Sequence, residues 1–342
     1  MKKIILIILI LLTSGCYNYK EVDDLALVSS LAINYIDNNF EVIIEVEENN
    51  KDDKYQSHLL KGIGSTIESA MENTSISLNK ELYFINLDAL LLSTDVVNEK
   101  LDQVLDFIIR DNNFSFDYNV IICDKSQEVI ESIINTDEIF GTYIQNVYEN
   151  TNNNLVNIKI YKLLDIFLND YQDIILPIFD FEEDLILINR AAIFSKNKIV
   201  NYLDSKEIAL YNILNNNYMN YYLDFNLENK KATFKGNNYI TKSIYQNNTI
   251  KIFTRLEGSL VETENIDVKN KNDLDKINNE FKKSINNFIL KLYQNNSDIL
   301  GFKNKIHKKN KNIDSTLTNI KYNINTKTII DDDSLILESI GK

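Results

Sequence analysis

The sequence predicts an α+β protein of several domains, in which sheets pack against helices. In the first half, short strand-like runs alternate with amphipathic helical runs. The second half contains a meander of alternating residues and then a long amphipathic helix. Because 44% of the 342 residues are apolar, the chain can bury a sizeable core. This length is typical of two or three domains.

The N-terminal region begins as a β-hairpin and continues with alternating helices and strands. Residues 25–35 and 40–46 are strand-like, and the turn Asp37-Asn38-Asn39 joins them. Asp124 and Gln127 have the spacing of a capping box that opens a helix through Ile133. Between these elements, the pattern predicts a helix over 62–78, a strand over 82–92, a helix over 95–108 and a strand over 116–123.

The middle of the chain contains a second hairpin followed by a capped helix. Residues 151–154 indicate a loop, and a helix is predicted over 158–168. Strands over 185–194 and 199–203 flank a turn at 195–198. Asp204 and Glu207 have capping-box spacing and open a helix that runs to residue 214.

The C-terminal part combines a meander with the clearest helix of the chain. Residues 218–261 indicate antiparallel strands, and residues 274–292 place apolar side chains at helical spacing. We predict that this helix packs on a sheet, with Phe281 and Phe288 in the core, and that Gly301 after it needs a positive φ. Two closing strands are predicted over 321–330 and 334–340. The predicted domains are residues 1–15, a signal peptide; 16–185, two subdomains; and 186–342.

Residues 1–16 have the pattern of a bacterial lipoprotein signal. Lys2 and Lys3 precede nine apolar residues, and Ser14-Gly15 leads directly to Cys16. Nine residues rise about 14 Å in a helix, less than half of a ~30 Å hydrocarbon core. We therefore predict cleavage before Cys16 and lipidation of Cys16. An ordinary signal peptide with a chance cysteine is the alternative.

The charge of the chain argues against partners rich in phosphate. Without residues 1–15 the chain keeps 34 basic against 50 acidic side chains, a net charge of about −16. Such a surface repels nucleic acid and anionic lipid headgroups. We therefore expect membrane attachment through acyl chains on Cys16 and no nucleic-acid partner.

The chain offers little material for catalysis or metal binding. Only His58 and His307 are present, and neither has a Cys or His neighbour at metal-ligand spacing. Residues 62–66 lack the third glycine and the Gly-Lys-Ser/Thr of phosphate-binding loops, so helix entry is the better interpretation. Cys123 lies in an apolar run and is expected to be an inert buried thiol. We predict no metal, no cofactor and no catalytic residue.

Acidic residues leave two alternatives open. Glu45 to Glu48 and Asp331-Asp332-Asp333 could bind a hard cation weakly, although solvated turns and faces fit them better. A pair of carboxylates for glycoside hydrolysis stays possible, because spacing in three dimensions is invisible in a sequence.

The stretch across the predicted cleavage point, Gly15-Cys16-Tyr17-Asn18-Tyr19-Lys20-Glu21-Val22, resembles that of the Ger(x)C family of spore germination lipoproteins. In that family the pattern is Gly-Cys-Trp-Asp, two polar residues and Glu-Ile, followed by an apolar run to Gly-Ile-Asp. Here Tyr17 replaces the Trp, Asn18 the Asp, and Ala32-Ile33-Asn34 the Gly-Ile-Asp.

Further stretches resemble the family in the same order along the chain. Arg190 and Ala191 replace the Gly-Thr of the family's hairpin pattern. The stretches are a helix entry at 64–70, a helix ending in Arg-Asp at 105–111, the hairpin at 191–200, and an Asp-x-x-Gly-Phe motif within 297–302.

The resemblance implies an elongated protein with mixed α/β domains, commonly three, tethered to the outer face of the spore inner membrane. It implies the lipoprotein subunit of a nutrient germinant receptor, beside two integral-membrane partner subunits of the A and B type, without known catalytic chemistry. It does not say whether this subunit binds nutrient directly. The alternatives are a solute-binding lipoprotein of a transporter and, less in keeping with the sequence, a tethered hydrolase.

Overall fold

The computed structural model describes most of the chain from Leu25 to Ile330. The described residues are 25–49, 55–76, 78, 80–150, 155–168, 172–195, 198–217, 220–227, 230–263, 271–309 and 320–330. The predicted signal peptide, Cys16, the loop at 151–154, Asp331 to Asp333 and the strand at 334–340 lie outside these residues.

The first sheet has nine strands and mixes antiparallel and parallel pairing. Its order is β3-β2-β1-β5-β6-β7-β8-β9, and β4 pairs with β1 off this path. Strands β3, β2 and β1 pair antiparallel, and so do β7, β8 and β9. Between them, β1, β5, β6 and β7 pair parallel. The strands are β1 (Leu25–Ile36), β2 (Asn39–Asn49), β3 (Tyr55–Gly64), β4 (Glu81–Tyr83), β5 (Ala89–Leu92), β6 (Asn119–Ile122), β7 (Ile174–Glu182), β8 (Leu185–Ser195) and β9 (Lys198–Leu203).

Helices cover both faces of the first sheet. The face that carries Leu90 and Val120 packs against one set of helices, and the face that carries Leu91 and Ile121 packs against another. The first set is α2 (Ile67–Ser75), α3 (Thr94–Glu99), α4 (Leu101–Arg110) and α7 (Ile160–Phe167), and the second is α5 (Ser126–Ile134) and α6 (Phe140–Asn150). Because the parallel strands are covered on both faces, β5 and β6 are continuous apolar runs that are buried throughout.

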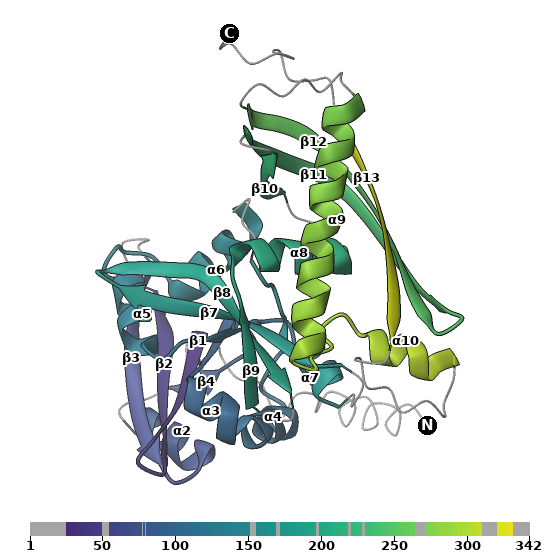
Figure 1. Cartoon of the computed structure of the whole chain (residues 1–342). Helices are drawn as coiled ribbons and strands as arrows, with labels where there is room; N and C mark the ends of the chain where they lie inside the picture. The colour runs from purple at the N-terminus through teal and green to yellow at the C-terminus, as the bar shows by residue number, and fades with distance from the viewer. Residues whose placement is uncertain are drawn as a thin grey trace, which may run out of the picture.

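The second sheet has four strands and is covered by helices on one face. Its order is β10 (Tyr221–Leu227), β11 (Lys230–Gln246), β12 (Thr249–Thr263) and β13 (Lys321–Ile330). The first three strands pair antiparallel, and β13 adds to β12 in parallel. Helix α9 (Lys271–Gln294) runs along this sheet, as Figure 1 shows. Phe281 and Phe288 of α9 are buried, which confirms the prediction for both residues.

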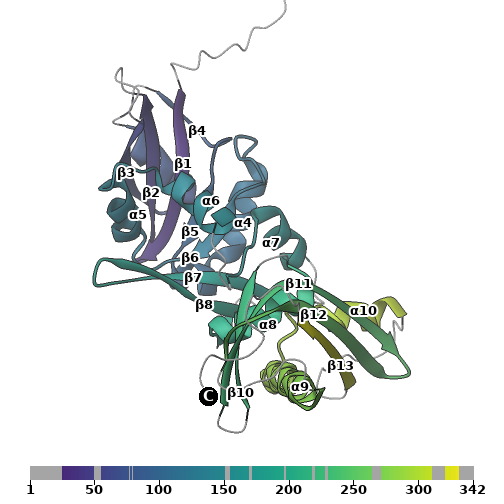
Figure 2. The same cartoon turned by 90° about the horizontal axis from the view of Figure 1, so that it is seen from above.

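One apolar core joins the second sheet to the end of the first. Helix α8 (Ser205–Asn215) contributes Ile208 and Ile213 to a cluster that also contains Ala191 and Ile193 of β8 and Phe234 of β11. Figure 2 shows the resulting extended molecule, with β1 to β3 at one end and β10 to β13 at the other. The predicted α+β class, with sheets packed against helices, is confirmed.

Several elements match the sequence patterns closely. Asp37 and Asn38 have φ values of 50° and 64°, as the tight turn between β1 and β2 requires. Asp204 accepts a hydrogen bond from the backbone N–H of Glu207 at 2.9 Å, and Glu207 accepts one from the N–H of Asp204 at 3.1 Å. This reciprocal pair is the predicted capping box of α8.

The predicted helix over 62–78 begins too early, because the sequence analysis missed β3. Gly62 and Gly64 belong to the end of that strand, and α2 begins only at Ile67, after the N-cap Thr66. A Cβ on Gly62 would lie 2.2 Å from the carbonyl oxygen of Ala70, so the glycine allows α2 to pack against the strand. The pattern therefore predicted a helix that exists, but its first residues belong to β3, on which this helix packs.

The predicted capping box at Asp124 and Gln127 is wrong. The N-cap of α5 is Lys125, which makes no side-chain capping bond. Asp124 instead accepts hydrogen bonds from the backbone N–H and the hydroxyl of Thr94, at 2.6 and 2.9 Å. The carboxylate therefore holds the start of α3, a long-range contact that outcompetes the local one.

Three further predictions need correction. The helix over 95–108 is two helices, α3 and α4, that meet at Lys100 with a non-helical φ of −133°. The strand over 82–92 is two short strands, β4 and β5, and both pair with β1. Besides β3, three elements were not predicted at all, namely α6, β7 and α10 (Phe302–Lys309); β7 contains the only proline, Pro177.

Candidate functional site

The predicted lipidation residue, Cys16, lies outside the described residues, so its modification stays a prediction. The other stretches that carry the family resemblance can be placed. Two of them meet at one surface groove of the first half, and a third forms a buried junction between the halves of the molecule. We take the groove and the junction as the candidate site.

The groove lies where α2 begins and α4 ends, and it encloses about 790 Å³. Residues 64–70 and 105–111 are about forty positions apart in the sequence, yet both contribute to its lining. The side chains that line it are Phe40, Ser65, Thr66, Ile67, Glu68, Gln103, Asp106, Phe107, Arg110, Asp111, Asn112 and Asn113.

The one basic side chain of this groove is paired with an acidic side chain of the same groove. Arg110 forms an ion pair with Asp106 at 2.7 Å, one turn away on α4, and both side chains are exposed. The hydrogen bond from Arg110 lowers the pKa of the Asp106 carboxyl. Thr66 and Ser69 satisfy the first backbone amides of α2 through a capping box. The lining carries the carboxylates of Glu68, Asp106 and Asp111 against the single guanidinium of Arg110, so the groove is acidic.

The hairpin stretch at 191–200 supports the first sheet. Ala191, Ala192 and Ile193 are fully buried in β8. Arg190, which replaces a small family residue, forms an ion pair with Asp180 of β7 at 2.7 Å. Its guanidinium also lies 6.0 Å from the ring centre of Tyr202. The departure from the family pattern is therefore compensated within the same sheet.

The Asp-x-x-Gly-Phe motif forms the junction through the buried carboxylate of Asp298. This carboxylate accepts hydrogen bonds from the backbone N–H groups of Phe302 and Lys303, at 2.8 and 2.7 Å, and so caps α10 (Phe302–Lys309). The backbone N–H of Asp298 donates to the carboxylate of Asp173 at 2.6 Å, and the N–H of Asp173 donates back to the Asp298 carbonyl at 3.2 Å. Asp173 directly precedes β7, so the motif ties α10 to the first sheet.

Gly301 has the positive φ that the sequence predicts, at +63°. The Gln172 amide donates to the carbonyl of Ile299 at 3.3 Å, and a Cβ on Gly301 would lie 3.1 Å from the Gln172 side-chain oxygen. Backbone conformation and space therefore both favour glycine here. Asp173 and Gln172 were not identified from the sequence, because no local pattern links them to a motif more than 120 residues away.

Glu45 was interpreted as part of a solvated face, and for this residue the interpretation is wrong. Its side chain is buried in the first sheet. It accepts hydrogen bonds from the hydroxyls of Ser29, Ser30 and Ser57 at 2.6 to 2.8 Å. The backbone N–H of Phe140 donates to it at 2.8 Å, so the same carboxylate also holds the start of α6. Glu45 is therefore a structural hub between β1, β2, β3 and α6.

The remaining candidates from the sequence are structural or stand apart. Cys123 is buried, as predicted, and burial raises the pKa of its thiol to about 12, which disfavours the reactive thiolate. His58 lies on β3 and His307 on α10. Within the described ranges, no group of three or more His, Cys, Asp or Glu side chains is placed to hold a metal ion.

The fold and the junction place this chain in the class of α+β proteins whose two sheets share one apolar core. Comparison with known proteins gives the family. Residues 18–181 match the spore germination protein N-terminal domain, and residues 189–333 match the spore germination B3/GerAC-like C-terminal domain. The chain belongs to the GerAC-like family of spore germination proteins.

A solved structure shares this fold. The chain is similar to the crystal structure of the GerBC protein with a TM-score of 0.54 and 14% identity, over 87% of this chain and 96% of that one. A search of curated proteins found no match. In the part of the chain that the structure describes, no helix has the length and apolar character needed to cross a bilayer.

We predict that Gly301→Val destabilises the protein by about 1 kcal/mol or more, because valine disfavours positive φ and meets Gln172. Chemical denaturation measures the change in unfolding free energy. Gly301→Asn is the matched control, since asparagine tolerates this φ better. An unchanged unfolding midpoint for the valine variant would contradict the assignment.

We predict a pH-dependent difference between the wild type and Asp298→Asn. Burial raises the pKa of Asp298 to about 6, so the folded state takes up a proton more readily than the unfolded chain. Lowering the pH from 7 to 5.5 therefore stabilises the wild type relative to this variant by about 0.8 kcal/mol.

The measurement is the unfolding free energy of each protein at both pH values. Asp106→Asn is the control, because the pKa of Asp106 is lowered and this carboxylate does not titrate in that interval. If the difference between the wild type and Asp298→Asn is constant with pH, the titration of Asp298 in this interval is refuted.

Proposed function

We propose that this chain is the lipid-anchored, non-enzymatic C subunit of a spore nutrient germinant receptor. It is held on the outer face of the spore inner membrane by acyl chains on Cys16. It acts in germination through contacts with integral-membrane receptor subunits of the A and B type.

The observation that carries the proposal is the pair of family matches, in order, over 18–181 and 189–333. They supply the germination role, and they favour it over a solute-binding lipoprotein or a tethered hydrolase. The likeness to the GerBC structure supports the same fold. We further propose a signal at 1–15 and regions at 16–185 and 186–342; the gap between the two matches, from 181 to 189, supports the division near residue 185.

The geometry of the site supports action by contact. The buried carboxylate of the junction, Asp298, accepts hydrogen bonds from backbone amides and thereby fixes the start of α10. The groove between α2 and α4 offers an exposed ion pair and amide side chains without a nucleophile and base in hydrogen-bonding contact among its described lining residues. Such a surface recognises another protein chain by shape and polar contacts.

The proposed anchor is supported by the signal pattern and by the position of Cys16, nine residues before β1 begins at Leu25. Nine residues reach about 30 Å when extended. Acyl chains bury about 0.8 kcal/mol per methylene, so two or more chains hold a folded protein firmly at a bilayer.

We predict that Cys16→Ala releases the protein from membranes and abolishes its labelling by radioactive palmitate. Fractionation of spore membranes and autoradiography measure both effects. Cys123→Ala is the matched control, because the chain has two cysteines and this one is buried, so its variant keeps label and membrane attachment. Label on the Cys16→Ala protein would place the anchor elsewhere.

We predict that spores lacking this chain lose germination in response to particular nutrients while growth is unchanged. The physical reason is that the membrane partners lose the surface they contact. Loss of refractility after nutrient addition measures the response, and re-expression of the wild-type chain restores it. Normal nutrient germination of the deletion strain, tested over a full nutrient panel, would refute the receptor role.

A further inference from the structure

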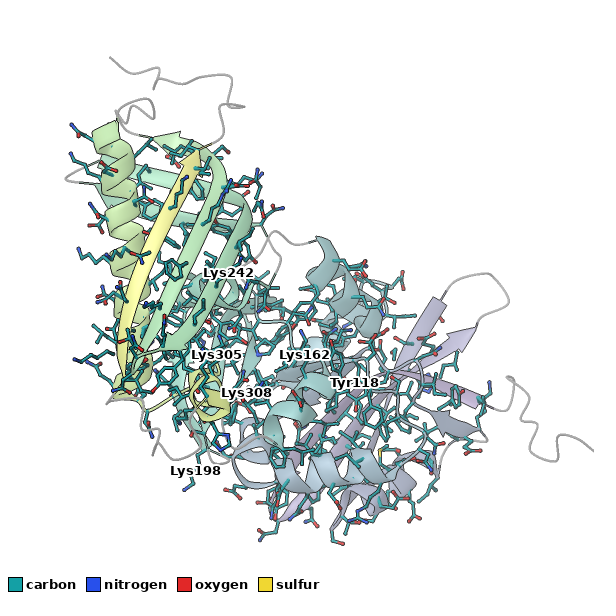
Figure 3. All side chains as sticks on the ribbon, turned by 90° about the vertical axis from the view of Figure 1, so that its right-hand side faces the viewer. Tyr118, Lys162, Lys198, Lys242, Lys305 and Lys308 are labelled. Atoms are coloured by element: carbon teal, nitrogen blue, oxygen red, sulfur yellow. The ribbon has the colours of Figure 1, made fainter. Side chains whose placement is uncertain are left out.

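The second sheet has one face covered by α9 and one open face, which is turned toward the viewer in Figure 3 and carries Lys242. Strand alternation assigns every second residue to each face. Tyr239, Thr241 and Tyr245 of β11 are buried on the covered face. Their neighbours Ile240, Lys242 and Ile244 are exposed on the open face. We define the open face as every second residue of 238–246 in β11, 249–257 in β12 and 321–329 in β13.

The open face is cationic, although the whole chain carries a net charge of −14. Its only acidic side chain, within these described strand segments, is Glu257, which is ion-paired with Arg255 and accepts a hydrogen bond from Asn238 at 2.7 Å. A local excess of positive charge therefore stands out against the acidic remainder. The basic residues of the face are Lys242, Lys251, Arg255, Lys321 and Lys327.

Apolar side chains are interleaved with these cations. Ile240, Ile244 and Phe253 are 50%, 47% and 43% exposed. Pairing across the strands places Ile240 opposite Arg255 and Phe253 opposite Lys242. A depression of about 280 Å³ lies among them, bordered by Lys242, Arg255 and Lys327. The face thus combines a shallow hollow with apolar walls and a rim of positive charge.

We propose that this open face docks an acidic segment of a partner protein that carries a large apolar side chain. The side chain occupies the depression, and the flanking carboxylates lie against Lys242, Arg255 and Lys327. Shape favours a protein over a bilayer: a hollow receives a protruding side chain, whereas binding to lipid needs apolar groups that protrude. Charge complementarity supplies the steering and the specificity.

This inference rests on the shape and charge of the face and is independent of the anchor at Cys16. Its test therefore uses a probe in solution. A fluorescein-labelled peptide with one central Phe flanked by Glu residues is titrated with the full chain in an uncharged detergent, and anisotropy reports binding. We expect saturable binding that weakens as salt is added.

Variants of the chain locate the binding. Lys242→Glu, Arg255→Glu and Lys327→Glu combined are expected to weaken the peptide at least tenfold. The matched control reverses three exposed lysines away from this face, Lys80, Lys282 and Lys283, and is expected to change affinity less than twofold. Thermal unfolding confirms that both variants fold. Phe253→Ala is expected to weaken the Phe peptide but not a version with Ala at its centre.

Several results would overturn the proposal. Equal binding by the wild type and the first triple variant would remove the face as the site. Binding to vesicles with anionic phospholipid through the same three cations, without peptide binding, would make it a lipid contact. Peptide binding that arises only when the chain is shortened to end at Ile330 would show that residues 331–342, with their three aspartates, occupy the face instead.

Discussion

Burial of Asp298 between α10 and the segment before β7 is the interaction on which the arrangement of the two halves depends. A buried carboxylate is costly unless hydrogen bonds replace its water. Here the backbone N–H groups of Phe302 and Lys303 in α10 donate to the carboxylate. The backbone N–H of Asp298 donates to the carboxylate of Asp173, and the N–H of Asp173 donates to the Asp298 carbonyl. The carboxylate of Asp298 therefore fixes the start of α10, and the backbone of the same residue couples α10 to the segment before the first sheet's β7.

The shared apolar core also connects the two halves of the molecule. Ile208 of α8 packs in one cluster with Ile193 of the first sheet and Phe281 of α9. Because close-packed interiors transmit strain, a displacement of α9 or α10 would shift the side chains of β8 that pack in the same cluster. The groove in the first half and the proposed docking face in the second therefore belong to one connected body, as the proposal of action by contact requires.

How much of this the sequence could predict depends on whether the signal is local. The capping box of Asp204 and the periodicity that buries Phe281 involve residues within one helix, and both were predicted. Asp124 has the same local pattern, but its carboxylate accepts hydrogen bonds from Thr94, thirty residues away, and not from its own helix. Glu45 looks solvated in sequence because the three serines and the helix start that hold it come from other elements. For Cys16 the pattern predicts lipid attachment, which is a covalent modification and is tested by labelling.

Departures from the family pattern show which constraints the fold enforces. Arg190 stands where the family pattern described in the sequence analysis has a small residue, and Asp180 on the next strand neutralises it, so a changed side chain is balanced by a neighbour. Gly301 permits fewer exchanges, because its φ of +63° is a backbone property that no neighbour can compensate and that Gly and Asn tolerate best. A fold shared at 14% identity is expected to vary at positions like the first and to keep positions like the second. The junction motif should therefore persist where surface ion pairs do not.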